Sequence, residues 1–322
     1  MKVIVFDLLP YGENLDHLKN GATELEWPLP KRYFDPEVAM RTYEEHLEAW
    51  ALMDGLGYYG VGFNEHHTSP YGMMPSPNLM AAAASQITDR MKLLIYGNCL
   101  PVHEPLRLAE ELAMLDCLTD GRLISGFVRG IPREYVAYGV DQGESQARFK
   151  EAWEIIKLAW SEESFSYKGD FWTYNDVAIW PRPVQQPRPP VWVPVTVSKE
   201  TIEWAGQEDI PITPGANAPL AVMKDMINFY AECLVENGHS ITPDHVVLRA
   251  NVYVADNRQQ AMKEAGPYTL YFFHTLFSHG SVSNVANQQS SGYRSESDYD
   301  YIKPENREAF MGALQSFRTM TL

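Results

Sequence analysis

The feature that most constrains the fold is the regular alternation of β-rich apolar runs with segments of helical periodicity. The runs 3–9 and 92–100 are each followed by a helical segment, at 38–56 and at 105–118. Such alternation is typical of a parallel sheet whose strands are joined by helices. The chain has 322 residues, which is long for an ordinary domain but suits one α/β barrel.

We therefore expect residues 1–322 to form one domain, a TIM-type (β/α)₈ barrel with insertions. The predicted strands are 3–9, 58–63, 92–100, 122–128, 191–197, 210–213 and 245–254. The predicted helices are 38–56, 78–88, 105–118, 146–160, 200–207, 220–238, a start at 258–266, and 304–319. No eighth strand is evident. Either the chain ends before the eighth strand and the final helix, or that strand lies in a segment that the pattern does not reveal.

One segment interrupts the alternation. Residues 164–190 are rich in aromatic residues and proline, so we expect an extended excursion whose tryptophans pack onto the body of the barrel. The polar stretch 276–303 has no clear periodicity.

The composition limits the classes of partner. The formal net charge is −16 at pH 7, so a nucleic acid or an anionic membrane would be repelled. The three cysteines are widely spaced and form no CxxC or Cys/His pattern, which argues against zinc and fits a reducing compartment. The sequence shows no signal peptide and no run of about 18 apolar residues, so we expect a cytoplasmic protein without a transmembrane helix.

The loops after the predicted strands carry polar residues, as a ligand site at the carboxyl end of a barrel requires. The run 64–67 (Asn-Glu-His-His) closes the second predicted strand, and His66 within it can move a proton near neutrality. Two other interpretations of this run are a buried, hydrogen-bonded histidine, and a pair of metal ligands formed by His66 and His67. No third ligand is evident, so we expect no metal site.

Basic and hydroxyl side chains mark a second candidate group. Arg129 follows the fourth predicted strand and Arg148 opens the next helix, and arginine binds a phosphate bidentately. Ser198 and Thr201 lie at the start of the helix after the fifth predicted strand, where backbone N–H groups also favour an anion. An ordinary N-cap is the commoner role for Ser198, but the combination favours a phosphate site. No Rossmann, P-loop or GxSxG sequence is present.

Five short runs, taken in their order and spacing, carry a resemblance to a known family. They are the run 64–67, Leu115-Asp116 with Asp120-Gly121-Arg122, Phe127-Val128-Arg129-Gly130, Trp180-Pro181-Arg182-Pro183, and 198–204. Together they resemble the luciferase-like flavin monooxygenases, in particular the FMN-dependent branch that includes the alpha subunit of bacterial luciferase. The similarity runs from residue 1 to about 214, and more loosely to 318.

The resemblance implies roles for single residues. His66 matches the family's catalytic histidine, Arg129 and Arg148 match its phosphate-binding arginines, and Ser198 and Thr201 match the hydroxyls that hold the same phosphate. The implied cofactor-binding set is Glu65, Asn98, Val128, Arg129, Arg148, Val197, Ser198 and Thr201.

Two further positions follow from the resemblance. Val128 stands where luciferase has a reactive cysteine beside the flavin ring, so that thiol is absent here. The pair Tyr96-Gly97, just before Asn98, would match the family's non-proline cis peptide bond.

The activity that the resemblance implies is an FMN-dependent monooxygenase. A separate NADH-dependent flavin reductase would supply reduced FMN, which would react with O₂ to give a flavin 4a-hydroperoxide in a pocket that excludes water. His66 would assist proton transfer, and the oxygen would pass to a small, apolar organic substrate. The resemblance also implies a homodimer that pairs through the helices after the second and third strands.

Three alternatives stay open. They are a deazaflavin-dependent oxidoreductase on the same barrel, a flavin-binding homologue without turnover, and a metal-dependent barrel hydrolase that uses His66 and His67. The loops 10–36, 68–77 and 266–303 are expected to line the substrate pocket.

Overall fold

The computed structural model of this protein describes residues 2–22, 24–195, 198–215 and 220–281. Its strands are β1 (Ile4–Asp7), β2 (Gly60–Phe63), β3 (Lys92–Ile95), β4 (Asn98–Cys99), β5 (Leu123–Val128), β6 (Phe165–Lys168), β7 (Thr173–Val177), β8 (Val191–Val195) and β9 (Ile212–Pro214). A curled parallel sheet has the order β1-β2-β3-β5-β8-β9, with β4 beside β5. In the described residues the fold is therefore a parallel α/β half-barrel, open between β9 and β1.

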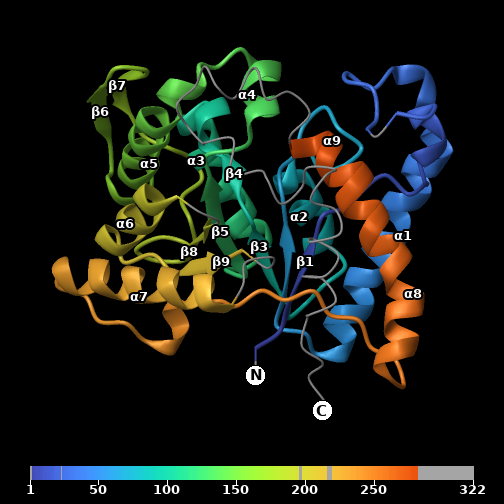
Figure 1. The fold of residues 1–322 in the computed structure, drawn as a ribbon. Coiled ribbons are helices and arrows are strands. Elements are labelled where there is room, and N and C mark those ends of the chain that lie inside the picture. Colours follow the sequence, from blue (N-terminus) through green and yellow to red (C-terminus); the bar gives the residue numbers. More distant parts are fainter. Residues whose placement is uncertain (1, 23, 196–197, 216–219, 282–322) are drawn as a thin grey trace.

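Helices surround the outer side of this sheet (Figure 1). The α-helices are α1 (Pro36–Leu56), α2 (Pro77–Ser85), α3 (Pro105–Leu118), α4 (Pro132–Tyr138), α5 (Ser145–Ser161), α6 (Lys199–Gln207), α7 (Leu220–Glu236), α8 (Arg258–Tyr271) and α9 (Ser278–Ser281). A π-helical turn, η6 (Phe272–Phe277), links α8 to α9. Short 3₁₀ turns are η1 (Asp16–Lys19), η2 (Lys31–Tyr33), η3 (Leu100–Val102), η4 (Gln142–Glu144) and η5 (Pro243–His245).

Helix starts share one local device. In α1, α2 and α3, a proline occupies the first helical position, and the preceding side chain accepts a backbone N–H of the first turn. These capping residues are Asp35, Ser76 and Glu104. Proline suits this position because its fixed φ is helical and no N–H is lost there. The caps fix where each loop from the carboxyl end of a strand enters its helix.

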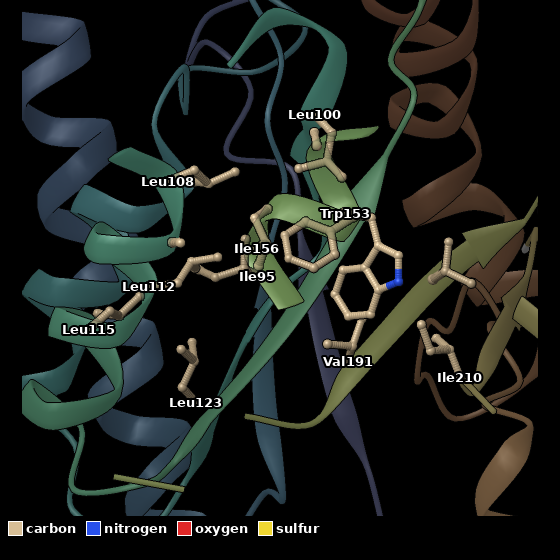
Figure 2. Close-up of a cluster of buried hydrophobic side chains, with 14 of the residues drawn as sticks. Ile95, Leu100, Leu108, Leu112, Leu115, Leu123, Trp153, Ile156, Val191 and Ile210 are labelled. Atoms are coloured by element: carbon tan, nitrogen blue, oxygen red, sulfur yellow. The ribbon is translucent and has the colours of Figure 1, made fainter. Parts of the chain in front are cut away.

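The main core lies between the sheet and its helices. Figure 2 shows Leu112 and Leu115 of α3, with Trp153 and Ile156 of α5, gathered against the strands near Leu123. All of these side chains are buried. Complete burial of a large apolar side chain stabilises a fold by about 1.5–3 kcal/mol, so this layer holds the half-barrel together.

The inner face of the sheet has its own packing. Leu94, Tyr96 and Ile124 form a second buried cluster, with Trp192 partly buried against it. The Tyr96 hydroxyl hydrogen-bonds the Thr213 hydroxyl across the interior. Because alternate residues of a strand face opposite sides, these side chains fill the barrel while their neighbours face the helices.

The first six predicted strands are confirmed with changed bounds: the third, 92–100, is divided into β3 and β4, and the sixth, 210–213, is shifted to 212–214. The seventh is wrong. Within 245–254, Val246 alone bridges to Ile212, and Arg249 Nε donates to the Pro214 carbonyl at 3.1 Å. The Arg249 guanidinium lies 6.0 Å from the Phe6 ring. The Arg249 side chain therefore contacts both β9 and β1, the two strands at the open side of the sheet. Val252 stays 77% exposed, so burial does not hold this β-branched stretch in the sheet.

The segment 164–190 is an excursion, as expected, and it contains the antiparallel pair β6–β7. Trp172 packs against the main core, but Trp180 is 85% exposed, so the expectation that every tryptophan packs inward is wrong. The cis peptide bonds of the described residues all precede proline, so the expected cis bond at Tyr96-Gly97 is not present. The predicted helix at 304–319 lies outside the described residues.

No helix within the described ranges is long and apolar enough to cross a membrane.

Candidate active site

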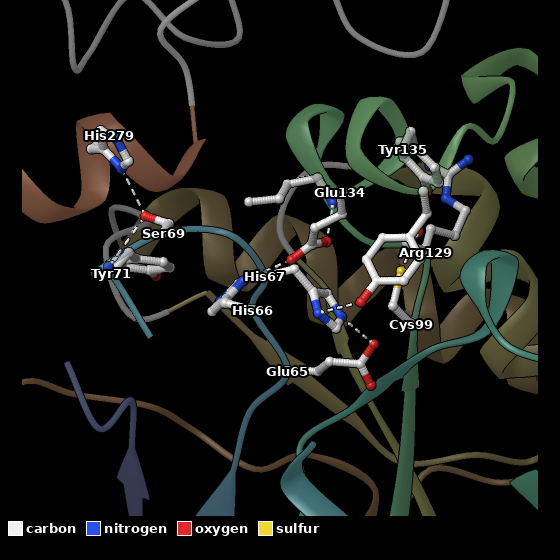
Figure 3. A network of polar contacts seen from close by, with 12 residues as sticks. Glu65, His66, His67, Ser69, Tyr71, Cys99, Arg129, Glu134, Tyr135 and His279 are labelled. Carbon is white, nitrogen blue, oxygen red and sulfur yellow. Dashed lines mark hydrogen bonds and ion pairs between the residues drawn. The ribbon is translucent and has the colours of Figure 1, made fainter. Parts of the chain in front are cut away.

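The candidate site lies where β2, β4 and β5 end, beside the start of α6. In a parallel sheet these carboxyl ends meet at one edge, so loops that are distant in sequence come together. Figure 3 shows the result: the loop after β2 brings Glu65, His66 and His67 towards Arg129 and Glu134, which follow β5.

Glu65 is the centre of a buried polar network. Its side chain is fully buried and accepts hydrogen bonds from His67 Nε2 at 2.9 Å, His103 Nε2 at 2.8 Å and Asn98 Nδ2 at 3.1 Å. Burial alone would raise the pKa of Glu65, but the hydrogen bonds from His103 and His67 lower it to about 2. Glu65 is therefore an ionised residue that orients its neighbours.

The same network fixes the two histidines that contact Glu65. Burial alone would lower the pKa of His103, but the hydrogen bond to Glu65 raises it by more. The pKa of His103 therefore lies above its ordinary value. His67 Nδ1 lies 2.9 Å from the Tyr138 hydroxyl, so both ring nitrogens of His67 have protein partners. His67 is buried and belongs to the Glu65 network.

His66 points away from Glu65 and pairs with a different carboxylate. Its Nδ1 lies 3.0 Å from Glu134 Oε1, while Glu134 Oε2 accepts the Ile131 backbone N–H at 2.8 Å. The Glu134 side chain is 1% exposed and the His66 side chain 19% exposed. A carboxylate held in this way accepts the Nδ1 proton of the ring and directs Nε2 to the other side, as a proton-transfer group requires.

This arrangement does not support joint metal ligation by His66 and His67. The two rings bond different carboxylates, Glu134 and Glu65, on opposite sides of the loop. Within the described ranges, no three His, Cys, Asp or Glu residues gather in the geometry of a metal site.

Three of the predicted phosphate-binding residues come together. Arg129 Nη2 donates to Ser198 Oγ at 3.0 Å, and Thr201 donates to the same atom through its hydroxyl at 3.0 Å and its backbone N–H at 3.3 Å. Ser198 is also the N-cap of α6, which is the commoner of the two roles expected for it, and its phosphate-binding role stays a prediction. Ser198 Oγ donates to Glu200 Oε2 at 2.8 Å. The Glu200 carboxylate therefore lies at the N-terminus of α6, where the helix dipole favours a negative charge.

Arg148 lies apart from this cluster. Its Nε pairs with Glu144 at 3.0 Å, and its guanidinium lies 4.4 Å from the Phe171 ring, on the excursion. In the described part of the chain, Arg148 makes no hydrogen bond to Arg129 or to Ser198. Val197 falls outside the described residues.

Val128 and a neighbouring cysteine face the same region. Val128 is partly buried and pairs in register with Cys99 of β4. Cys99 Sγ lies 3.2 Å from the Arg129 carbonyl, and burial raises the pKa of this thiol well above its ordinary value. A thiol therefore lies one strand away from the position of the family's cysteine, but in its protonated, unreactive form.

Two asparagines at the strand ends hold unsatisfied polar atoms. Both side-chain polar atoms of Asn64, and Oδ1 of Asn98, are buried and have no hydrogen-bond partner in the described residues. A buried amide without partners costs free energy, so such atoms indicate a site that a ligand completes.

Several site residues were not predicted from the sequence. Glu134 and His103 were missed because nothing in their local pattern distinguishes them from surface residues of short loops and helix starts. Asn64 had a usable signal, since it is the first polar residue after the buried strand β2.

The family model for luciferase-like monooxygenases matches residues 23–317 of the chain. The chain belongs to the luciferase-like monooxygenase family. Protein y4wF of Sinorhizobium fredii is 37% identical to this chain, in an alignment that covers 57% of this chain and 52% of that protein. The chain therefore spans about half the length of that relative. The oxygenase component of the flavin-dependent trigonelline monooxygenase of Acinetobacter baylyi is 28% identical over 75% of this chain and 68% of that protein.

Solved structures share the fold of this luciferase-like protein. The monooxygenase RslO1 from Streptomyces bottropensis has a TM-score of 0.73 and 28% identity, with 87% of this chain and 80% of that chain covered. The 3,6-diketocamphane monooxygenase component of Pseudomonas putida, solved in complex with FMN, has a TM-score of 0.69 and 19% identity over 84% and 74% of the chains. An F420-dependent secondary alcohol dehydrogenase has a TM-score of 0.62 and 17% identity over 84% and 86%. The last two show the common fold alone.

Proposed function

We propose that this protein is an FMN-dependent monooxygenase that uses reduced flavin and O₂ to oxygenate a small organic substrate with an apolar body. One observation carries the proposal: the cluster of Arg129, Ser198 and Thr201 and the pair of His66 and Glu134 lie at the same edge of the sheet. An anion-binding group and a proton-transfer group are thereby combined in one site.

The residues present fit a flavin. Arg129, Ser198 and Thr201, with the backbone N–H groups that begin α6, would hold its phosphate. The buried Asn64 amide offers both a donor and an acceptor of the kind that the polar edge of a flavin ring requires. When bound, reduced FMN supplies the electrons that activate O₂.

The protein's own residues would hold and move the proton. Glu134 fixes the His66 ring through Nδ1, so Nε2 is the atom that would exchange a proton on the pocket side. The buried Glu134 side chain keeps this orientation of the ring, because its second oxygen is held by the Ile131 backbone N–H. Tyr71 packs 4.5 Å from the His66 ring centroid, and Phe272 lies 5.8 Å beyond it, so apolar rings limit the access of water.

The reductase, the homodimer and the cytoplasmic location belong to the same proposal. A relative is named an "oxygenase component", which supports a separate second component, and we propose that this component is an NADH-dependent flavin reductase. Leu79 of α2 is 73% exposed and Met114 of α3 is 50% exposed, and both would suit a dimer contact through these helices. The three cysteines are free thiols, which suits the cytoplasm.

A deazaflavin-dependent oxidoreductase is the alternative that the fold also permits. Titration of the purified protein with FMN and with a reduced deazaflavin, followed by flavin fluorescence or absorbance, separates the two. We expect FMN to bind more tightly, and we expect O₂ uptake with reduced FMN to depend on an aldehyde, ketone or hydrocarbon substrate. Failure to bind FMN in either redox state refutes the proposal, and binding without substrate-dependent turnover indicates a non-catalytic homologue.

A further inference from the structure

Arg133 is a buried cation that the flavin site does not use. It lies at the second position of α4 and is 7% exposed, yet none of its guanidinium nitrogens has a hydrogen-bond acceptor within the described ranges. Burial lowers its pKa to about 10, which leaves the group charged at neutral pH. A buried charge whose N–H groups have no hydrogen-bond acceptor is costly, and a ligand with acceptor oxygens would relieve that cost.

The guanidinium is oriented by an aromatic ring. Its carbon lies 3.8 Å from the centre of the Trp27 ring. A guanidinium stacked on a ring still presents its N–H donors in its own plane, where a planar, two-oxygen acceptor can take two of them. Glu24 acts on Arg133 through its charge but makes no hydrogen bond with it. The geometry therefore favours a planar anion, as a carboxylate is.

A chain of contacts joins Arg133 to the loop after β2. The Trp27 ring lies 5.0 Å from the ring of His279, which is fully buried. Burial and the nearby charge of Arg133 lower the pKa of His279 to about 4, so the imidazole is neutral. Its Nε2 lies 3.2 Å from the Glu26 carbonyl, an acceptor, so Nε2 carries the proton. Of Arg133 and His279, Arg133 alone therefore carries a positive charge.

The same chain of contacts returns to the candidate catalytic histidine. His279 Nδ1 accepts from Ser69 Oγ at 2.8 Å, and Ser69 Oγ accepts the Tyr71 backbone N–H at 3.2 Å. The Tyr71 ring packs against His66, as Figure 3 shows, and the circuit closes because Glu134, which holds His66, is the next residue after Arg133. A molecule bound to Arg133 would thus lie beside Trp27, and the residue next to Arg133 in α4 holds His66.

We propose that Arg133 binds the carboxylate of the substrate, and that the substrate class is a small aromatic carboxylate whose ring lies beside Trp27. This inference rests on the proposed function, because it names the substrate of that site. The sequence predicts a small, apolar substrate, and this proposal specifies a substrate with an apolar ring and a single anionic group.

The test compares benzoate with benzamide, which has the same ring without the charge. Each is titrated by calorimetry into the full chain, with and without saturating oxidised FMN. We expect benzoate to bind about tenfold or more tightly than benzamide, since charge-assisted hydrogen bonds supply that preference. Arg133→Met should remove the preference, Arg133→Lys should restore part of it, and Arg41→Met, on the exposed face of α1, should leave it unchanged.

The outcomes separate this inference from the proposed function. Equal binding of the two probes to the native protein, or a preference that survives in Arg133→Met, overturns the carboxylate site. Competition between benzoate and FMN also overturns it, because Arg133 would then belong to the flavin phosphate. Weaker benzoate binding in Glu24→Gln would contradict it too, since a neighbouring negative charge opposes an anion. If the native chain does not bind FMN, the proposed monooxygenase function is refuted. The benzoate titration without flavin still decides the role of Arg133.

Discussion

The imidazole of His66 and the carboxylate of Glu134 form a pair, with Nδ1 and Oε1 3.0 Å apart, although the two residues are 68 positions apart in the sequence. Glu134 is itself held through Oε2 by the Ile131 backbone N–H, so its orientation is fixed before any ligand arrives. Both ring nitrogens of His67 have hydrogen-bond partners, so it is His66, rather than His67, whose second ring nitrogen has no hydrogen-bond partner in the described residues.

Replacement of Glu134 by glutamine should lower kcat by about tenfold or more, since general acid–base catalysis contributes about 100- to 10,000-fold and requires an oriented ring. Glutamine has one acceptor oxygen in place of two, so it can accept only one of the two hydrogen bonds that Glu134 accepts now, and it holds the His66 ring less firmly. The measurement is substrate-dependent O₂ uptake with reduced FMN over a range of pH. The FMN dissociation constant should stay within about twofold, and an unchanged kcat with an unchanged pH profile would assign Glu134 a structural role alone.

Replacement of Arg129 by alanine should weaken FMN binding by about 1.5–3 kcal/mol, the range of a charge-assisted hydrogen bond. Arg148→Ala should weaken it less, because Arg148 pairs with Glu144 and stacks on Phe171 rather than joining the Ser198 cluster. Flavin fluorescence titration measures both. Glu200→Gln should not weaken binding, since it removes a negative charge beside Ser198. A larger loss in Arg148→Ala than in Arg129→Ala would place the phosphate elsewhere.

The sheet and the strand-end residues were predictable for the same reason. Buried parallel strands need continuous apolar runs, and the polar residues that follow them must meet at one edge, so His66, Arg129 and Ser198 stand out in the sequence. Glu134 and Arg133 do not, because α4 is a seven-residue helix whose importance depends on packing against the loop after β2. The stretch 245–254 has strand-like residues, but strand formation also needs a partner with a free edge in register.

Replacement of Glu65 by glutamine should destabilise the fold by about 3–5 kcal/mol near neutral pH, the range for one partner removed from a buried ion pair. The folded-state pKa of Glu65 is lowered from 4.5 to about 2, so its contribution is present above pH 4.5 and is lost as the pH falls through about 2. His103 has a pKa raised above 6.5, so its contribution is present below 6.5 and is lost as the pH rises through the raised value.

The difference in unfolding free energy between Glu65→Gln and the native protein should therefore be largest between pH 4.5 and 6.5. Urea unfolding at several pH values measures it. Glu45→Gln is the matched control, because Glu45 is exposed and its ion pair with Arg41 spans 4.0 Å; we expect a change within about 0.5 kcal/mol. A loss for Glu65→Gln that does not diminish towards pH 2 would show that packing, rather than charge, holds the network.

The backbone at Gly130 lies close to Glu134, so a side chain added at Gly130 tests whether the position of Glu134 controls His66. Its φ is +94°, and a Cβ there would meet Cys99 Sγ and lie 2.8 Å from Glu134 Oε2. Gly130→Ala should therefore cost about 1–3 kcal/mol of stability and also lower kcat, because the added methyl displaces the carboxylate that orients His66. Gly139→Ala separates the two causes: its φ is +67°, but nothing lies within 4 Å of its Cβ, so it carries the backbone strain without the clash. Urea unfolding and O₂ uptake of both variants give the answer. If Gly139→Ala lowers kcat as much as Gly130→Ala does, the loss comes from backbone strain at the ends of α4 and not from displacement of Glu134.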